Sequence, residues 1–560
     1  MTGAAVVALV LVTVLIGARG VAAMRTTSDF LVASRQTSPL LNAAAVSGEY
    51  LSAASFLGVA GLVIKEGTGA LWYPVGFTAG YLLMLALVAA PMRRTGALTV
   101  PGFAEARLGS PRLRRFSAIV VVVIAGLYLV PQFVAAGQLL TLVSDVPYWV
   151  GVVVAGAAVS ITLALGGMRA ATYVQAFQFV LKLLLFAGPA IWLLIVAGPE
   201  LRGQMAAPPE FTTFTRDTDV DFRLDTTLVL PSPLAVVVDG EPRALGAGPH
   251  PATADTVWTF PAGAPVPYVA GAAEDLPVPG SAAWGVPLLG TGSDSPLLAT
   301  WSVLVATALG TMGLPHIIVR FHTAPDGRAA RRTAAITVGL LGTFYLFPIV
   351  YGLLGTVLTP ELYLSEGTDT AVVMLPGRVA GDGLASSIVT ALLAAGAFAA
   401  FLATSLGLLL ALAGALAHDL MPSGLRRLRL SALAAAAVVV TAALFASRVD
   451  VSAAVTSSFA VAASTFCPLL VLGIWWRRLT ARGALAGMTA GLLGSLGAMA
   501  LAAVPGSPVP AGGTVALLLS QPALWSVPLA FVIMISVSLT DHAPPWAEAT
   551  MLRLHLADRR

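Results

Sequence analysis

A stretch near position 50 combines an acidic residue, a glycine and several hydroxyl groups within an apolar run. The run NAAAVSGEYLSAASFLG brings together Ser47, Gly48, Glu49, Tyr50 and Ser52. A glycine permits local unwinding of a helix, and the carbonyl groups freed in this way are able to bind a cation. A surface of small residues that packs against another helix is the alternative. Because an acid within an apolar segment is rarely idle, we favour a functional role for Gly48 and Glu49.

Two further apolar runs carry polar residues. Thr404 and Ser405 are neighbours in the run AAFLATSLG, and hydroxyl oxygen is a hard donor that suits a small cation. Taken alone, these hydroxyl groups are better explained as bonding back to carbonyl groups of their own helix. Gln175 and Gln178 lie three apart on one helical face, which Lys182 continues. These amides either line an inner vestibule or form a network that ties helices together.

Composition shows where these residues must lie. The chain has 560 residues, of which 57% are hydrophobic and 10% are charged, and its mean hydropathy is +0.88. A soluble globular protein is about one quarter charged. The chain is therefore predicted to be an all-α protein that crosses the membrane many times, which excludes a soluble enzyme and a nucleic-acid-binding protein. The single cysteine, Cys467, excludes an internal disulfide.

Thirteen apolar runs are long enough to span a bilayer. They cover residues 3–23, 41–64, 70–92, 114–143, 147–166, 170–198, 297–318, 333–358, 385–417, 428–447, 450–476, 483–504 and 516–539. With the N-terminus outside, 23 of the 31 Lys and Arg residues fall in cytoplasmic segments, whereas the short external loops keep Lys65, Arg378 and Arg448. Positive charge marks the cytoplasmic side, so the prediction is N-terminus outside and C-terminus inside.

Two segments need separate interpretation. The first apolar run has no basic residue before it, as a signal peptide would have, so we expect an uncleaved helix. Residues 199–296 are rich in Pro, Gly, Thr and Asp, and they include short β-like runs at 228–230 and 235–238. We expect a solvated external insertion without a role in transport, with a lid or a partner-binding module as the alternative. The acidic cluster at 217–225 lacks the glycine and distal glutamate of a calcium loop.

Motifs of enzymes and channels are absent. The sequence has no phosphate-binding loop of the ATPase type, no histidine pair with metal-ligand spacing and no potassium-filter signature. His316, His322 and His418 fall near predicted cytoplasmic helix ends, where they are more simply explained as helix-end residues than as ligands. We therefore expect no enzymatic activity and no organic cofactor.

At these same residues the chain resembles the sodium:solute symporter family, and it is most similar to the bacterial cation/acetate symporters, which carry short monocarboxylates. The matching stretches are SDFLVASR (28–35), GEYLSAASFLG (48–58), TVPGFAEAR (99–107), GGM (166–168) with Val174 and Gln175, GLPHIIVR (313–320) and ALAHD (415–419). They cover most of the chain apart from 199–296 and the C-terminal region.

The resemblance implies a leucine-transporter-like core, in which five helices are repeated in inverted orientation with broken helices at mid-membrane. The first repeat would occupy 41–198 and the second 297–482. Residues 1–40 would add an N-terminal helix and a cytoplasmic loop, and 483–560 would add peripheral helices and a cytoplasmic tail. The external insertion, 199–296, would separate the repeats.

The resemblance also implies two groups of site residues. The sodium site would use carbonyl groups of Gly48, Leu51 and Ala400 and the hydroxyl group of Thr404. At position 403, where the family often has a second hydroxyl group, this chain has Ala403, so either Ser405 compensates or the site is weaker. The substrate pathway would be lined by Ser47, Glu49, Tyr50, Ser52, Tyr128, Gln132, Gln175, Gly310, Thr311 and Gly313. Free N–H groups at the 310–313 break would suit a carboxylate. No charged residue is placed to pair with the anion, so a small monocarboxylate fits better than a dicarboxylate.

These implications give one main function with alternatives. We expect a secondary transporter of the bacterial plasma membrane that imports acetate, propionate or pyruvate with sodium by alternating access. A proton-coupled permease, a symporter of another small organic solute and a transporter-fold sensor are the alternatives. Missing hydroxyl groups and the protonatable Glu49 leave sodium and proton both open as coupling ions. The partners are the solute, the ion and the lipid bilayer, and a monomer is sufficient, although the sequence leaves the oligomeric state open.

Overall fold

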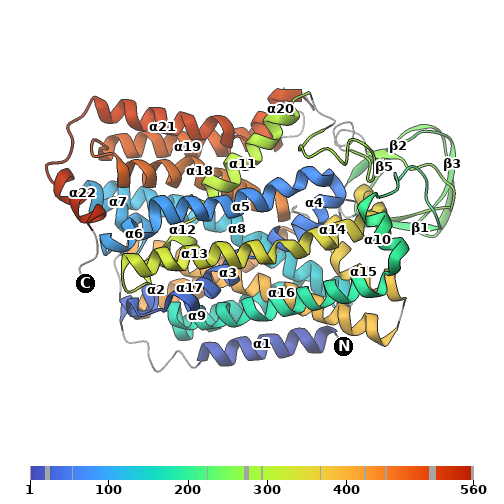
Figure 1. Cartoon of the computed structure of the whole chain (residues 1–560), viewed down its shortest axis with the longest axis horizontal. Coiled ribbons are helices and arrows are strands. Elements are labelled where there is room, and N and C mark those ends of the chain that lie inside the picture. The colour runs from blue at the N-terminus through green and yellow to red at the C-terminus, as the bar shows by residue number, and fades with distance from the viewer. Residues whose placement is uncertain are drawn as a thin grey trace.

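Most helices run along one common direction, and a small β-sheet unit lies at one end of them (Figure 1). The structure is a computed structural model that describes residues 2–18, 26–52, 54–144, 146–222, 225–269, 277–291, 294–365, 367–381, 383–421, 424–447, 449, 451–503 and 513–556. Arg448, which the charge count places outside, falls outside these residues. Helix α1 begins at the end that holds the β-sheets, and α22 lies at the opposite end. The predicted orientation requires this separation.

The helices are α1 (Thr2–Ala18), α2 (Thr27–Val32), α3 (Pro39–Tyr50), α4 (Val59–Glu66), α5 (Trp72–Leu83), α6 (Ala89–Thr95), α7 (Val100–Leu108), α8 (Pro111–Ser144), α9 (Tyr148–Val196), α10 (Gly198–Ala206), α11 (Pro296–Gly313), α12 (Pro315–His322), α13 (Gly327–Phe344), α14 (Leu346–Leu358), α15 (Ala371–Ala380), α16 (Leu384–Gly414), α17 (Leu425–Phe445), α18 (Val451–Trp475), α19 (Ala481–Ala503), α20 (Gly513–Ser520), α21 (Ala523–Leu539) and α22 (Ala547–His555). The strands are β1 (Thr218–Phe222), β2 (Thr226–Leu230), β3 (Leu234–Val238), β4 (Glu241–Leu245), β5 (Gly248–Ala252), β6 (Thr256–Phe260) and β7 (Tyr268–Val269).

Within the described residues, nine helices are long and apolar enough to cross a membrane, or ten if the bent pair α20 and α21 forms one span. Two of these nine reach over more than one predicted span. The continuous helical stretch Ala54–Thr95 reaches over parts of two predicted spans, and α9 covers two more. The total of thirteen spans therefore remains a prediction.

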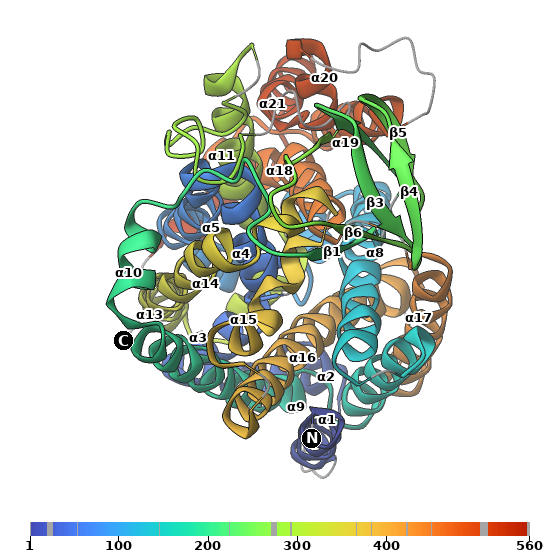
Figure 2. The ribbon, with the colours of Figure 1, turned by 90° about the vertical axis from the view of Figure 1, so that its right-hand side faces the viewer.

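Helices differ sharply in how deeply they are buried. The most apolar part of α18 is 89% buried, and so is that of the stretch Leu384–Leu420, which begins with α16. The corresponding part of α17 is only 33% buried. The view from the β-sheet end shows α17 and α1 at the periphery and α16 passing inward toward α8 (Figure 2). The inner helices are thus the ones able to carry a polar site, because the outer helices face lipid.

Glycine and capping residues set several helix boundaries. Gly167 has φ +53° inside α9, and a side chain there would come within 2.9 Å of the Cα atom of Phe30. It divides α9 at the point where the sequence separates two predicted spans. Thr99 begins α7 by accepting a hydrogen bond from the N–H of Gly102, which satisfies a free donor of the first turn.

The insertion, for which the sequence predicts an external location, folds into two antiparallel sheets. Their strand orders are β1-β6-β3-β4 and β5-β2-β7, and the β-like runs expected from sequence fall in β2 and β3. The sheets enclose an apolar core that contains Phe222, Trp258 and Phe260, and this core continues onto Tyr363 and Leu364 between α14 and α15. The insertion is therefore a folded unit that packs on the helical part.

The acidic cluster of the insertion serves the sheets themselves. The carboxylates of Asp217 and Asp225 accept backbone N–H groups of Ala262 and Ala254 at 2.8 Å each, and Asp219 accepts the hydroxyl of Thr259 at 2.6 Å. Each of these three carboxylates thus has a hydrogen-bond partner within the insertion. In the part of the chain that is described, no group of three or more His, Cys, Asp or Glu residues is arranged to hold a metal ion.

Trp284 joins the end of the insertion to the first half of the helical core. Its indole N–H donates to the carbonyl group of Val63 at 3.0 Å, and its ring packs against Val63 and Ala70. The Trp284 carbonyl accepts the N–H of Thr68 at 3.0 Å, and the tight turn at Gly67 lies directly against Trp284. The indole is 3% exposed, so nearly its whole surface is removed from solvent.

Replacing Trp284 by alanine should therefore lower the free energy of unfolding by about 3–5 kcal/mol, the usual cost of deleting a buried tryptophan. Thermal unfolding of the purified protein in detergent would measure the loss. The matched control is Trp149→Ala, because Trp149 is 57% exposed on α9 and should cost far less. Equal losses in the two variants would contradict the contact described here.

Candidate functional site

The first helix break follows α3. Leu51 leaves the helical conformation with ψ 81°, and the N–H of Ser52 donates to the carbonyl of Tyr50 at 2.8 Å. In a continued helix that N–H would bond to the carbonyl of Gly48. Unwinding was expected at Gly48 itself, and this is corrected: Gly48 is helical and the break begins at Leu51. Gly48 instead allows close packing, since a side chain there would overlap the backbone of Gln175.

The second break separates α11 from α12. Leu314 has ψ 115°, and Pro315 starts the next helix. The break expected at 310–313 therefore falls one residue later, because Gly310, Thr311 and Gly313 are still helical. The two glycines lie against backbone carbonyl groups of α18, where a side chain would clash. Thr311 connects the two breaks, since its hydroxyl group lies 2.6 Å from the hydroxyl group of Tyr50.

Three of the predicted sodium ligands, Gly48, Leu51 and Thr404, lie at the first break. The hydroxyl group of Thr404 on α16 donates to the carbonyl of Glu49 on α3 at 2.6 Å, and Ala400 lies one turn earlier on α16. The carbonyl groups of Gly48 and Leu51 both accept hydrogen bonds from the ammonium group of Lys182, at 2.6 and 2.8 Å. Two of the predicted sodium ligands are thus already bound to a cationic group of the protein.

Ser405 and Gln175 complete the surroundings of this site. The hydroxyl group of Ser405 is buried and has no hydrogen-bond partner within the described chain. Gln175 donates to the carbonyl of Ala403 at 2.7 Å, and Gln178 donates to Thr13 of α1 at 3.1 Å. Of the two interpretations of these amides, the contacts support a network that ties α9 to α16 and α1.

A buried ion pair lies next to the break that follows α3. Nε of Arg320 on α12 donates to the carboxylate of Glu49 at 2.5 Å, and both side chains are 0% exposed. The other N–H groups of this guanidinium donate to the hydroxyl group of Thr172 at 3.0 Å, to the sulfur of Met168 at 3.0 Å and to the amide oxygen of Gln175. Charge counting placed Arg320 in a cytoplasmic segment between spans, whereas the structure buries its side chain on α12, where it pairs with Glu49.

Several substrate-pathway residues meet between the two breaks. The hydroxyl group of Tyr128 on α8 donates to Ser52 at 3.2 Å, and its ring meets the ring of His316 edge-on at 5.6 Å. Among the described residues, the amide of Gln132, the hydroxyl of Ser47 and both ring nitrogens of His316 have no partner although they are buried. Buried polar groups are nearly always paired, so these four side-chain groups mark a place for a solute or water.

His316 is the site residue that sequence reasoning missed. It was expected at a cytoplasmic helix end, whereas it lies fully within the protein at the start of α12. The run GLPHIIVR contained the signal, because a proline directly before the histidine ends one helix and begins another.

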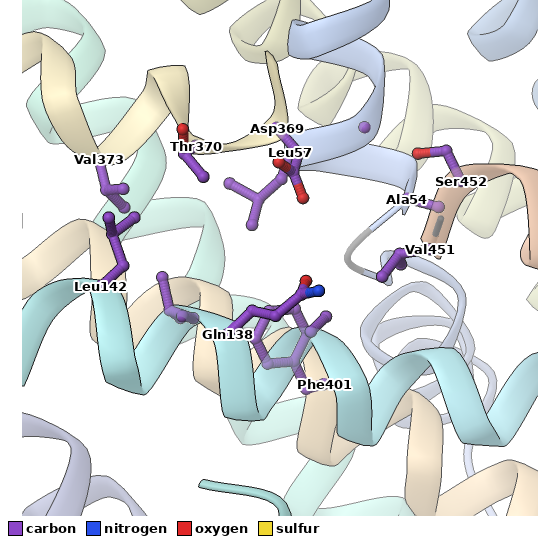
Figure 3. A pocket seen from close by; sticks show the side chains of 13 residues that line it. Ala54, Leu57, Gln138, Leu142, Asp369, Thr370, Val373, Phe401, Val451 and Ser452 are labelled. Carbon is purple, nitrogen blue, oxygen red and sulfur yellow. The ribbon is translucent and has the colours of Figure 1, made fainter. Parts of the chain in front are cut away.

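Two pockets approach the site from opposite ends. The first is lined by residues that include Leu57, Gln138, Asp369, Thr370 and Phe401. Figure 3 shows Gln138 and Phe401 on one side of it, and Leu57, Asp369 and Thr370 on the other. The second is lined by residues that include Thr99, His316, Arg320 and Asp419.

Neither pocket reaches the residues of the break itself. Tyr50, Leu51 and Ser52 are 0% exposed and line neither the first pocket nor the second. Tyr50, Leu51 and Ser52 are therefore closed off from both ends in this conformation, whereas His316 lines the second pocket. A closed polar centre between two end-facing pockets, held by broken helices inside an apolar bundle, defines a membrane transporter.

Comparison with known proteins identifies the family. Residues 30–238 and 292–491 match the sodium:solute symporter family, and the chain belongs to it. The members of this family, as its name states, move a solute together with sodium. The chain is therefore a multi-pass membrane transporter and not an enzyme. A relative in Bacillus subtilis (strain 168), the uncharacterized symporter YwcA, is 29% identical over 524 residues, which cover 91% of this chain and 88% of the relative.

Solved structures share the fold. A Na⁺-coupled sialic acid symporter in a substrate-bound outward-open state is similar over 97% of this chain and 98% of that chain, with a TM-score of 0.67 and 12% identity. Mhp1, a nucleobase-cation-symport-1 family transporter in a closed conformation with bromovinylhydantoin bound, is similar over 94% and 97%, with a TM-score of 0.54 and 12% identity. The leucine-transporter-like fold predicted from sequence is thus confirmed, and so is the family.

The ion pair gives a stability prediction. Glu49→Gln should lower the free energy of unfolding by about 3–5 kcal/mol, because it leaves the charge of Arg320 buried without a partner. The double variant Glu49→Gln, Arg320→Met should lose much less than the sum of the two single variants. Thermal unfolding in detergent would measure all three, and additive losses would show that the two charges are not coupled.

Proposed function

We propose that this chain carries a short monocarboxylate such as acetate, propionate or pyruvate into the cell, coupled to sodium, by alternating access. The observation that carries the proposal is that Ser47, Gln132 and His316, on helices that flank the two breaks, bury polar atoms that have no hydrogen-bond partner among the described residues. A solute held there must be small and polar, because the set is enclosed by buried side chains such as Tyr50 and Tyr128.

The chemistry of this set favours a single carboxylate. The first N–H groups of α12 have no partner within their own helix. They lie at the positive end of the helix dipole, which suits an anion. Arg320 is the nearest buried cation on that helix, and its guanidinium group is already bound by Glu49, Thr172 and Gln175. A second carboxylate would therefore find no free cationic partner on α12, which argues against a dicarboxylate.

The conformation supports an alternating cycle. Opening toward the first pocket would admit solute and sodium, and opening toward the second would release them to the cytoplasm. Sodium at the α3 break would connect α3 with α16, where Thr404 already contacts the carbonyl of Glu49. The membrane potential adds about 2.3 kcal/mol per charge for each 100 mV, so a cycle of one sodium and one anion draws only on the concentration gradients.

Uptake into proteoliposomes tests the proposed function. Labelled acetate, propionate and pyruvate would each be offered with an inward sodium gradient, with an inward proton gradient and with neither. We expect uptake of at least one of them with the sodium gradient alone. Uptake driven only by protons would replace sodium as the coupling ion, and no uptake of any of the three would refute the substrate class.

Thr404→Ala should raise the sodium concentration for half-maximal uptake by about tenfold, which corresponds to the loss of ~1.4 kcal/mol of binding free energy. The reason is the loss of the contact between α16 and the α3 break. Preference among the three monocarboxylates should not change. The control is Thr441→Ala on α17, whose hydroxyl group bonds only within its own helix. An unchanged sodium dependence in Thr404→Ala would remove this residue from the ion site.

A further inference from the structure

Lys182 is an uncommon residue in its setting. The chain has two lysines among 560 residues, and this one lies inside the second half of α9 with 0% exposure. Charged side chains within the membrane are costly and tend to be kept for a function. Within the described chain, the structure gives Lys182 no carboxylate partner, because the nearby Glu49 is paired with Arg320. The partners of its ammonium group are instead two backbone carbonyl groups.

These carbonyl groups belong to the predicted sodium site. The break after α3 frees the carbonyls of Gly48 and Leu51, and the ammonium group lies 2.6 and 2.8 Å from their oxygens. A sodium ion bound to the same two oxygens would lie next to a positive charge inside a low-dielectric interior, where like charges repel strongly. The arrangement therefore does not fit a sodium ion and the Lys182 ammonium together.

We propose that Lys182 is a tethered cation that competes with sodium for the carbonyl groups of Gly48 and Leu51. Sodium binds there only after the ammonium group has left these oxygens. The proposal deepens the proposed function, because it concerns the ion site of the same transport cycle.

The exchange changes which helices are joined at the break. The Lys182 ammonium connects the α3 break to α9, whereas sodium at the predicted site connects it to α16 through Thr404. Replacing one cation by the other thus shifts the connection from one helix to another without adding charge at the break. The unpartnered hydroxyl group of Ser405, on the same helix as Thr404, is an oxygen that sodium could recruit and the ammonium group does not use.

Binding of radioactive sodium to the purified full chain, without monocarboxylate, tests the competition. Lys182→Met removes the competing charge at similar length, so half-saturation should occur at a sodium concentration at least tenfold lower than in the unsubstituted protein. Lys182→Arg keeps a permanent positive charge and should weaken sodium binding or abolish it. Lys65→Met is the matched control, because Lys65 is the other lysine and lies at the end of α4, and its sodium binding should be unchanged.

Several outcomes would overturn the proposal. Unchanged or weaker sodium binding in Lys182→Met, with normal size-exclusion behaviour and thermal unfolding, would make Lys182 a structural residue. Absence of binding in both the unsubstituted protein and Lys182→Met would show that the break is not a sodium site. If Lys182→Met does not fold, Lys182→Gln decides, since it also removes the charge and unchanged binding there contradicts competition. Because no monocarboxylate is present, failure of the proposed substrate class leaves this test unaffected.

Discussion

A helix that stops inside a bilayer leaves backbone carbonyl groups that lipid cannot satisfy, so another group must bind them. This constraint organises the centre of the protein. The break at Leu51 frees two carbonyl groups, Lys182 reaches them from α9, and Thr404 takes the carbonyl of Glu49 from α16. The inner helices must therefore bring polar side chains to this depth, while the outer helices have no such demand.

The charges around the break are balanced as a group. Glu49 pairs with Arg320, and Thr172, Met168 and Gln175 satisfy the rest of the guanidinium group. A buried pair of this kind contributes little net stability by itself, but it is costly to leave half complete. It joins α3 to α12, the helices on either side of the polar centre, so the two broken helices are linked by charge at one point and by the Tyr50–Thr311 hydrogen bond at another.

Local pattern was sufficient to predict a helical protein with many apolar spans and a boundary between two of them near Gly167, because each depends on neighbouring residues. The fold was predicted from the resemblance of several motifs to a known family. It also indicated Gly48, Glu49 and Thr404 as an unusual set. It failed where long-range contacts decide. The sequence assigned Arg320 and His316 to a cytoplasmic helix end. Their burial could not be predicted there, because it depends on contacts with Glu49 and Tyr128, which lie far away in sequence. Likewise, the contact between Lys182 and the broken helix has no signature within α9 alone.

The insertion constrains how the two halves of the core move relative to each other. It is attached at two places, through Trp284 to α4 in the first half of the core and through Tyr363 and Leu364 to the second half. The insertion and the segment that follows it therefore contact both halves of the core at this end of the bundle. Any movement that separates α4 from residues 360–364 must therefore alter the packing of the insertion on one of the two halves, so the two halves do not move apart at this end at no cost.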